Sequence, residues 1–258
     1  KLFSRFLELS RSLQAADPGN AEYLRNLSVA QERVGDVALR KGAVQQAEPA
    51  FRESLKLRRQ LIEDDPENAA AQRDLSVTLD RLAELARLRG EMEAADKLLQ
   101  ESLDVRKKLY DADAANMQAL RDLSVSYAAL GDAALARNQS REAAEYFRFY
   151  LEMVERLTQS DPGNAQYQRD LAAAHERVSQ VSIRLGDWTS ALASGRRRTA
   201  IFAALVDAEP SNADYLRELS TGYRELSEIE LQVGELGAVR VTTEQYLKLT
   251  RKRAAANP

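Results

Sequence analysis

Side chains that could catalyse a reaction are few in this sequence. It contains one histidine, His175, and no cysteine. A Cys-His pair is therefore impossible, and any Ser-His-Asp triad would have to use His175. Neither a GxxxxGK(S/T) phosphate loop nor an HExxH zinc motif is present. The absence of cysteine also removes disulfides and zinc-thiolate sites. The usual catalytic and metal-binding motifs are thus missing.

Carboxylates are abundant, with 40 Asp and Glu residues in all. They recur once per unit of a repeated pattern, whereas a catalytic pair of carboxylates needs a unique environment that separates its two pKa values. We therefore predict that the protein is not an enzyme and that it uses no cofactor and no metal ion. The carboxylates are better explained as a surface that binds or remains solvated.

A repeat of 48 residues must position these side chains. It runs through five copies without an insertion or deletion, and it is marked by an Asn, an Arg and a Leu at fixed places. The Asn residues are Asn20, Asn68, Asn116, Asn164 and Asn212. A repeat this regular indicates a structural unit that packs against copies of itself.

Each copy has the pattern of two helices. The segment around Asp17-Pro18-Gly19-Asn20 ends one helix and starts the next, because proline cannot continue a helix and Asn is a strong N-cap. Apolar residues then recur at helical spacing on both sides of a turn residue, Gly42 in the first copy. Two helices of about 20 residues account for the whole unit.

These features predict an all-α fold, a right-handed α-solenoid of antiparallel helical hairpins with five repeats and a partial one before them. Residues 1–16 align with the second helix of a preceding repeat, so we expect a piece of a longer multidomain protein. One solenoid domain is predicted over residues 1–258, with repeats at residues 17–64, 65–112, 113–160, 161–208 and 209–258.

The pattern resembles the tetratricopeptide repeat (TPR). Its first copy places Val34-Gly35 in the first helix, Gly42 at the turn, and Ala47, Phe51 and Ser54 in the second helix. The usual unit has about 34 residues. The longer unit here is similar to the kinesin-light-chain type of repeat, as found in bacterial multidomain proteins. The resemblance implies a protein-binding scaffold whose first helices line a concave groove.

Helical geometry places positions 25, 29, 32 and 36 of each copy on one face of the first helix. That face carries a column of arginines and a band of carboxylates. The candidate partner-binding residues are Arg25, Glu32, Asp36, Arg73, Asp80, Glu84, Arg121, Asp132, Arg169, Glu176, Arg217 and Glu228. Each set allows two interpretations. The arginines can join adjacent repeats or contact a ligand, and the carboxylates can bind a partner or remain solvated.

Residues that break the repeat are further candidates for specificity. His175 occupies a column of the packing face, Trp188 opens a second helix, and Gly195 replaces Phe51 and Phe147. We interpret His175 and Trp188 as packing residues, and Gly195 as a groove, a kink or a weak point. The run Arg196-Arg197-Arg198 is interpreted as a solvated helix face.

The formal net charge of −3 favours neither nucleic acid nor an anionic membrane, and no apolar run is long enough to span a bilayer. We expect a cytoplasmic, bacterial protein whose partner is a protein or peptide, with basic residues favoured by the acidic band. Reversing charge at Glu32, Asp36, Asp80 and Glu84 should abolish binding without lowering stability. The alternative is a regulatory arm that docks on a neighbouring domain or associates with itself through uncapped ends.

Overall fold

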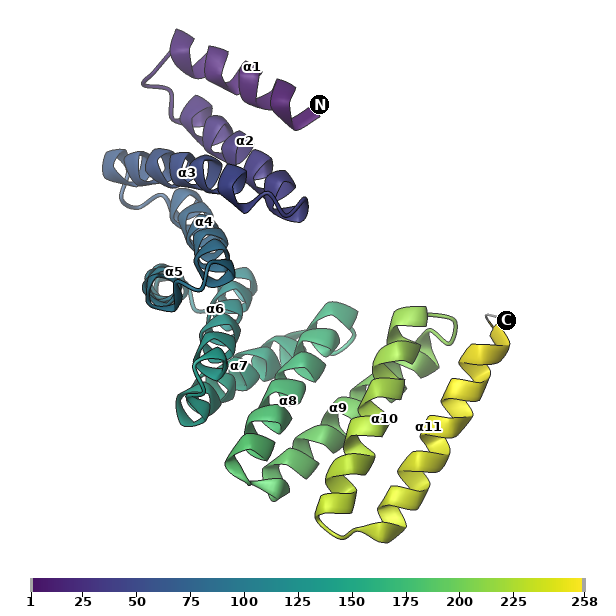
Figure 1. The fold of residues 1–258 in the computed structure, drawn as a ribbon. Coiled ribbons are helices and arrows are strands. Elements are labelled where there is room, and N and C mark those ends of the chain that lie inside the picture. Colours follow the sequence, from purple (N-terminus) through teal and green to yellow (C-terminus); the bar gives the residue numbers. More distant parts are fainter. Residues whose placement is uncertain (1, 257–258) are drawn as a thin grey trace. The chain divides into compact units, whose positions relative to one another are not determined.

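The chain is entirely helical where it is described. The computed structural model describes residues 2–256, with side chains to Arg251, and this range forms eleven α-helices and no strand (Figure 1). The helices are α1 (Leu2–Ala16), α2 (Ala21–Arg40), α3 (Val44–Asp64), α4 (Ala69–Leu88), α5 (Met92–Ala112), α6 (Met117–Ala136), α7 (Ser140–Ser160), α8 (Ala165–Leu185), α9 (Trp188–Ala208), α10 (Ala213–Gln232) and α11 (Leu236–Ala256). The all-α prediction is confirmed. Lys1, Asn257 and Pro258, at the ends of the predicted range, lie outside the described residues.

The helices belong to two compact units that divide between Ser126 and Tyr127, inside α6. In the first unit α2 packs against α1 and α3, and α4 packs against α3 and α5. In the second unit α8 packs against α7 and α9, and α10 packs against α9 and α11. Each of these helices thus packs on its neighbours in sequence, which is the topology of a helical repeat. A single solenoid over residues 1–258 stays a prediction, and each unit is described by itself.

The repeated asparagines cap the first helices as predicted. The Oδ1 atom of Asn20 accepts hydrogen bonds from the backbone N–H groups of Glu22 and Tyr23, at 3.0 and 3.2 Å. The equivalent residues Asn68, Asn116, Asn164 and Asn212 accept in the same way. These bonds satisfy N–H groups that have no partner within the helix, which fixes where each first helix begins.

The turn between the two helices of a hairpin also has the expected chemistry. Gly42 has φ of 72°, in the left-handed region, and Asn138 takes the same place in the third hairpin with φ of 61°. Glycine adopts this conformation without steric cost, and Asn is one of the few other residues that tolerates it. The second helix can therefore start within a few residues of the end of the first.

Apolar side chains from successive helices form the core of each unit. In the first unit Phe51 of α3 packs with Ala38, Ala47, Leu82 and Leu85. The Phe51 ring lies directly over Gly35 of α2: a Cβ atom on Gly35 would be only 2.6 Å from the ring. The close approach of the ring thus requires glycine at position 35.

A buried arginine links neighbouring hairpins in the first unit. Arg58 of α3, with 2% of its surface exposed, donates to Glu32 Oε2 of α2 at 2.5 Å. It also donates to the backbone oxygen of Asp74 in α4 at 2.5 Å and contacts the hydroxyl of Thr78. One guanidinium therefore satisfies acceptors on both flanking first helices, which a side chain with a single N–H donor could not do.

Removal of this arginine should destabilise the protein far more than removal of an exposed one. Arg58→Ala leaves the carboxylate of Glu32 buried and unpaired, so the free energy of unfolding should fall by about 3–5 kcal/mol. Arg25→Ala removes a pair whose arginine is 52% exposed, and it should cost less than about 1 kcal/mol. Urea unfolding followed by circular dichroism measures both losses. Similar losses in the two variants would contradict the role assigned to Arg58.

Candidate functional site

Two of the five arginines in the predicted column, Arg25 and Arg73, lie in contacts between hairpins. Arg25 of α2 pairs with Asp74 of α4 at 2.9 Å, and Arg73 pairs with Asp122 one hairpin further on. Arg217 pairs with Asp214 of its own helix at 2.9 Å. Arg169 donates to Gln166, and Arg121 has an interaction partner as well. Where the column is paired across hairpins, it joins one first helix to the next, as one of the two sequence interpretations held.

The inner carboxylates of the acidic band lie beside buried arginines. Glu32 pairs with Arg58, and Asp80 pairs with Arg106 at 2.6 Å. Arg106 is itself buried and donates to the hydroxyls of Ser76 and Ser126. Reversing charge at Glu32 or Asp80 would therefore place two cations together in the interior. We therefore expect these two reversals to lower stability, whereas the sequence alone predicted no loss because it did not show the buried arginines.

Two further carboxylates of the band join successive first helices. Arg81 of α4 pairs with Asp36 of α2 at 3.0 Å, and Arg177 of α8 pairs with Asp132 of α6 at 2.9 Å. These are the same two repeat positions in different copies. Because each carboxylate already pairs with an arginine of the neighbouring first helix, Asp36 and Asp132 would attract a charged partner less strongly.

Three candidate carboxylates remain the most available for contact with a partner: Glu84, Glu176 and Glu228. Glu84 lies 3.5 Å from Arg81, and Glu228, with 66% of its side chain exposed, lies 3.2 Å from Arg224. Glu176 lies 3.5 Å from Arg198, which has two closer carboxylate partners. Glu176 and Glu228 also line the same pocket, in the second unit.

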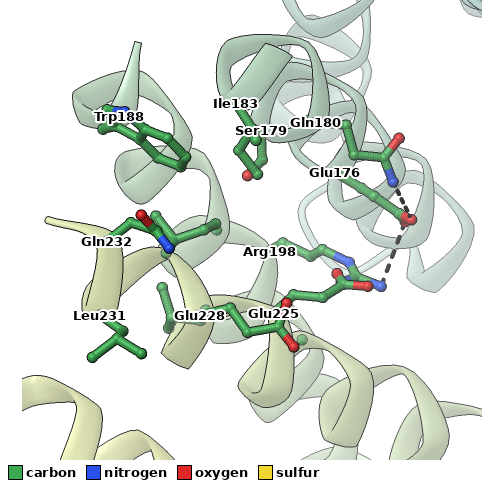
Figure 2. Close-up of a pocket in the computed structure, with 14 residues that line it drawn as sticks. Glu176, Ser179, Gln180, Ile183, Trp188, Arg198, Glu225, Glu228, Leu231 and Gln232 are labelled. Atoms are coloured by element: carbon green, nitrogen blue, oxygen red, sulfur yellow. Dashed lines mark hydrogen bonds and ion pairs between the residues drawn. The ribbon is translucent and has the colours of Figure 1, made fainter. Parts of the chain in front are cut away.

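This pocket has a volume of about 480 Å³ and lies between α8, α9 and α10. Figure 2 shows Ile183 and Ser179 on α8, Trp188 and Arg198 on α9, and Glu225 and Glu228 on α10 around the opening. The lining also includes the apolar side chains of Leu226 and Ile229. An apolar concavity with a few convergent charged groups is the usual form of a binding site.

Arg198 is the charged centre of this pocket. Its guanidinium donates to Glu225 Oε2 at 2.6 Å and to Glu218 Oε2 at 3.2 Å. It is 3% exposed, so the interpretation of Arg196-Arg197-Arg198 as a solvated face is wrong for Arg198. The available signal was its place in the repeat: it stands one helical turn before the column of Arg58 and Arg106. The exact 48-residue period does not reveal this arginine, because it aligns Phe202, and not Arg198, with Arg58 and Arg106.

The surroundings of Arg198 alter the ionisation of one carboxyl group. Burial raises the pKa of Glu225, and the nearby charge of Arg198 opposes that shift in part. The Nε atom of Arg198 is buried and has no hydrogen-bond acceptor among the described residues. The pocket lining therefore contains a partly desolvated carboxylate, with which a bound cation could pair.

His175 and Trp188 differ in their surroundings. His175 is 9% exposed, which agrees with its predicted place on the packing face. Burial, with a smaller contribution from the charge of Arg197, lowers the pKa of His175 to about 4. Trp188 is only partly buried and lines the pocket, so it both packs and faces a possible ligand.

Comparison with known proteins supports the repeat assignment. The family model of the tetratricopeptide repeat matches residues 74–148. No curated protein matches the sequence significantly. The structure of BtubC (BKLC) from P. vanneervenii has a TM-score of 0.74 at 19% identity, covering 99% of this chain and 89% of that one. The TPR-like repeats of a putative kinesin light chain from Podosopora anserina have a TM-score of 0.59 at 15% identity, covering 91% and 98%. Apo RapI has a TM-score of 0.67 at 9% identity, covering 95% and 59%.

At these identities the similar structures show the fold alone. Residues 74–148 match the tetratricopeptide-repeat family model, and the 48-residue period repeats the same sequence pattern in the other copies. The predicted resemblance and the α-solenoid class of TPR-like hairpins are thus confirmed. Repeat scaffolds of this kind typically mediate protein–protein interaction.

Two structural features are absent from the described residues: a membrane-spanning helix and a metal-binding cluster. No helix among residues 2–256 combines the length and the apolar character needed to cross a membrane. In the same part of the chain, no group of three or more His, Cys, Asp or Glu side chains is arranged to hold a metal ion.

The buried histidine should make stability depend on pH. Its pKa is about 4 when folded and about 6.5 when exposed in the unfolded chain, so between these values the unfolded chain binds the extra proton. The stabilisation is therefore complete above pH 6.5 and is lost as the pH falls toward 4, by up to about 3 kcal/mol. Urea unfolding over this pH range measures the effect.

His175→Gln is the matched control, because Gln31 occupies the same repeat position and is buried. Carboxylates titrate in both proteins, so the difference between the two pH profiles isolates the histidine. Superimposable profiles would contradict the assigned pKa.

Proposed function

We propose that this protein is a non-enzymatic scaffold that binds a protein or peptide segment along its first helices. The observation that carries the proposal is the 480 Å³ pocket between α8, α9 and α10, because Glu176 and Glu228 of the predicted groove face line it. The tetratricopeptide repeats supply the structural context. No cofactor or metal ion is part of the proposal.

The charges of the lining favour a basic partner. The lining contains three carboxylates, those of Glu176, Glu225 and Glu228, and one guanidinium, that of Arg198, so it carries more negative than positive charge. Exposed pairs with Lys or Arg would each contribute about 1 kcal/mol or less. Their main effects would be orientation and faster association. The same carboxylates would repel the phosphates of a nucleic acid.

In the first unit only part of the acidic band is proposed to contact a partner. Glu84 is the candidate there, since Glu32 and Asp80 are engaged by buried arginines and Asp36 by Arg81. The arginine column is proposed to hold the hairpins together and not to select the ligand.

Charge reversal at exposed residues tests this function without disturbing the core. Dodecamer peptides selected from a random phage library by the immobilised protein should be enriched in Lys and Arg. The Glu84→Lys/Glu228→Lys variant should bind the selected peptides about tenfold more weakly, through lost attraction and added repulsion. Its unfolding midpoint should be unchanged, because both side chains are exposed. Fluorescence anisotropy measures the binding.

The matched control is Glu152→Lys/Glu155→Lys, which changes the net charge equally at exposed positions of the second helix α7. It should bind as the parent protein does. Equal losses in both double variants would reduce the effect to net charge and would count against a groove on the first helices.

A second candidate function is self-association, favoured by exposed apolar side chains on α1 and α11. Leu2 is 82% exposed and Leu9 59%, while Leu236 is 67% exposed and Val241 55%. Exposed apolar side chains that form a large contiguous patch mark an interaction surface more often than singly scattered ones do. Such surfaces would suit a second copy of the chain or a neighbouring domain, as in the alternative predicted from the sequence.

Sedimentation velocity over a wide concentration range tests this candidate. Association should increase with concentration and should weaken in the Leu9→Asn/Val241→Asn variant, because both changes reduce the apolar area available for burial. A sedimentation coefficient that stays monomeric at every concentration would rule out self-association.

A further inference from the structure

One side-chain seat recurs in several hairpins. In the first hairpin the Phe51 ring lies over Gly35 of the same hairpin and against Leu82 and Leu85 of the next first helix. In the third hairpin the Phe147 ring lies over Gly131 and against Val181 in the same way. The seat thus has a small residue as its floor and two aliphatic residues of the next helix as its wall.

At the equivalent repeat positions the second hairpin has another pair, Ala83 of α4 and Leu99 of α5, both buried. A slightly larger residue in the first helix is matched there by a smaller residue in the second helix. The chain therefore offers two versions of this pair, and the two side chains vary together in size. This covariation within one molecule indicates that the space is real and normally occupied.

In the fourth hairpin the seat has lost the side chain that fills it. Gly195 stands where Phe51, Leu99 and Phe147 stand in the first three copies, and Ser179 forms the floor. The aliphatic wall remains: a Cβ atom on Gly195 would lie 3.4 Å from Leu226 and 3.5 Å from Ile229. Gly195, Ser179, Leu226 and Ile229 all line the open pocket. The pocket therefore exists at the place where an internal apolar side chain is missing.

Charged groups surround the mouth of this empty seat. Glu225 and Glu228 come from α10 and Glu176 from α8, against the single guanidinium of Arg198 (Figure 2). Arg224 pairs with Glu225 and Glu228 from outside the lining, at 3.5 and 3.2 Å, and is half exposed. A cation bound at the mouth would therefore be attracted, while an anion would meet carboxylates.

We propose that the seat beside Gly195 binds one aromatic side chain of the partner peptide, and that an adjacent Lys or Arg of that peptide pairs with Glu225 and Glu228. This inference rests on the proposed peptide-binding function and gives it a specificity. The aromatic group replaces the ring that Phe51 and Phe147 supply internally.

Trp188 gives a direct measure of occupancy, because it is the one tryptophan of the sequence and it lines the pocket. Phenethylamine joins a phenyl ring to an ammonium group and serves as the probe. It should shift or quench the Trp188 fluorescence with saturation. Phenylacetate has the same ring with the opposite charge, and it should bind at least about tenfold more weakly.

Filling the seat should abolish this binding without unfolding the protein. Ser179→Gly/Gly195→Phe copies the Gly35–Phe51 pair, and Ser179→Ala/Gly195→Leu copies the Ala83–Leu99 pair. Ser179→Ala/Gly195→Leu removes a glycine from the middle of a helix, so its thermal midpoint should be maintained or raised. Ser179→Gly/Gly195→Phe moves the glycine from α9 to α8 and buries a ring, so its thermal midpoint should be maintained. The affinity of both variants for phenethylamine should fall by more than about tenfold.

Glu225→Gln/Glu228→Gln keeps the seat open, and it provides a test if a filled variant does not fold. It should weaken phenethylamine binding and reduce the preference over phenylacetate. An unchanged Trp188 signal in the parent protein, or undiminished binding by a folded, filled variant, would overturn the proposal.

The outcomes distinguish failure of the aromatic seat from failure of the peptide-binding function. If basic peptides still lose affinity in Glu84→Lys/Glu228→Lys but bind equally to the filled variants, the groove function stands and the aromatic seat does not. If phenethylamine binds the open seat but the phage library yields no peptide, the seat stands and the peptide-binding function does not.

Discussion

Every hairpin of this protein must bury an apolar stripe that it cannot cover by itself. Phe51 of α3 completes its contacts only when α4 brings Leu82 and Leu85 against it. In the second unit, Phe202 of α9 likewise packs with Tyr215 and Leu219 of α10. This dependence on the next hairpin makes the exact 48-residue period necessary, since an insertion would move one wall of each seat away from the other.

Ion pairs and hydrogen bonds, like the apolar contacts, link each hairpin to the next. Arg58 and Arg106 lie buried between successive first helices, each beside a carboxylate of its own hairpin and hydroxyls of the next. Pairs nearer the surface, such as Arg25 with Asp74, repeat the link with less burial. Much of the charge that appears free in the sequence is therefore used inside the array. Function must depend on the charge that remains.

The fourth hairpin is where the pattern leaves both space and charge. Gly195 removes an apolar side chain, while Arg198 moves the buried guanidinium by one turn and brings three carboxylates around it. An empty apolar seat next to excess negative charge does not stabilise the fold, because a filled seat would bury more apolar surface. A partner that supplies a ring and a cation would satisfy both, and this is the basis of the proposed specificity.

The sequence by itself determined the helices, their ends and their order, because Asn caps, turn glycines and apolar spacing act over a few residues. It also placed His175 correctly on the packing face. Only the tertiary structure decided which charges are available. Glu32 and Glu228 occupy the same face by helical spacing, yet one is buried beside Arg58 and the other is exposed beside a pocket. Burial depends on side chains from other helices, such as Arg58 and Arg198, and spacing within one helix carries no information about how far those side chains reach.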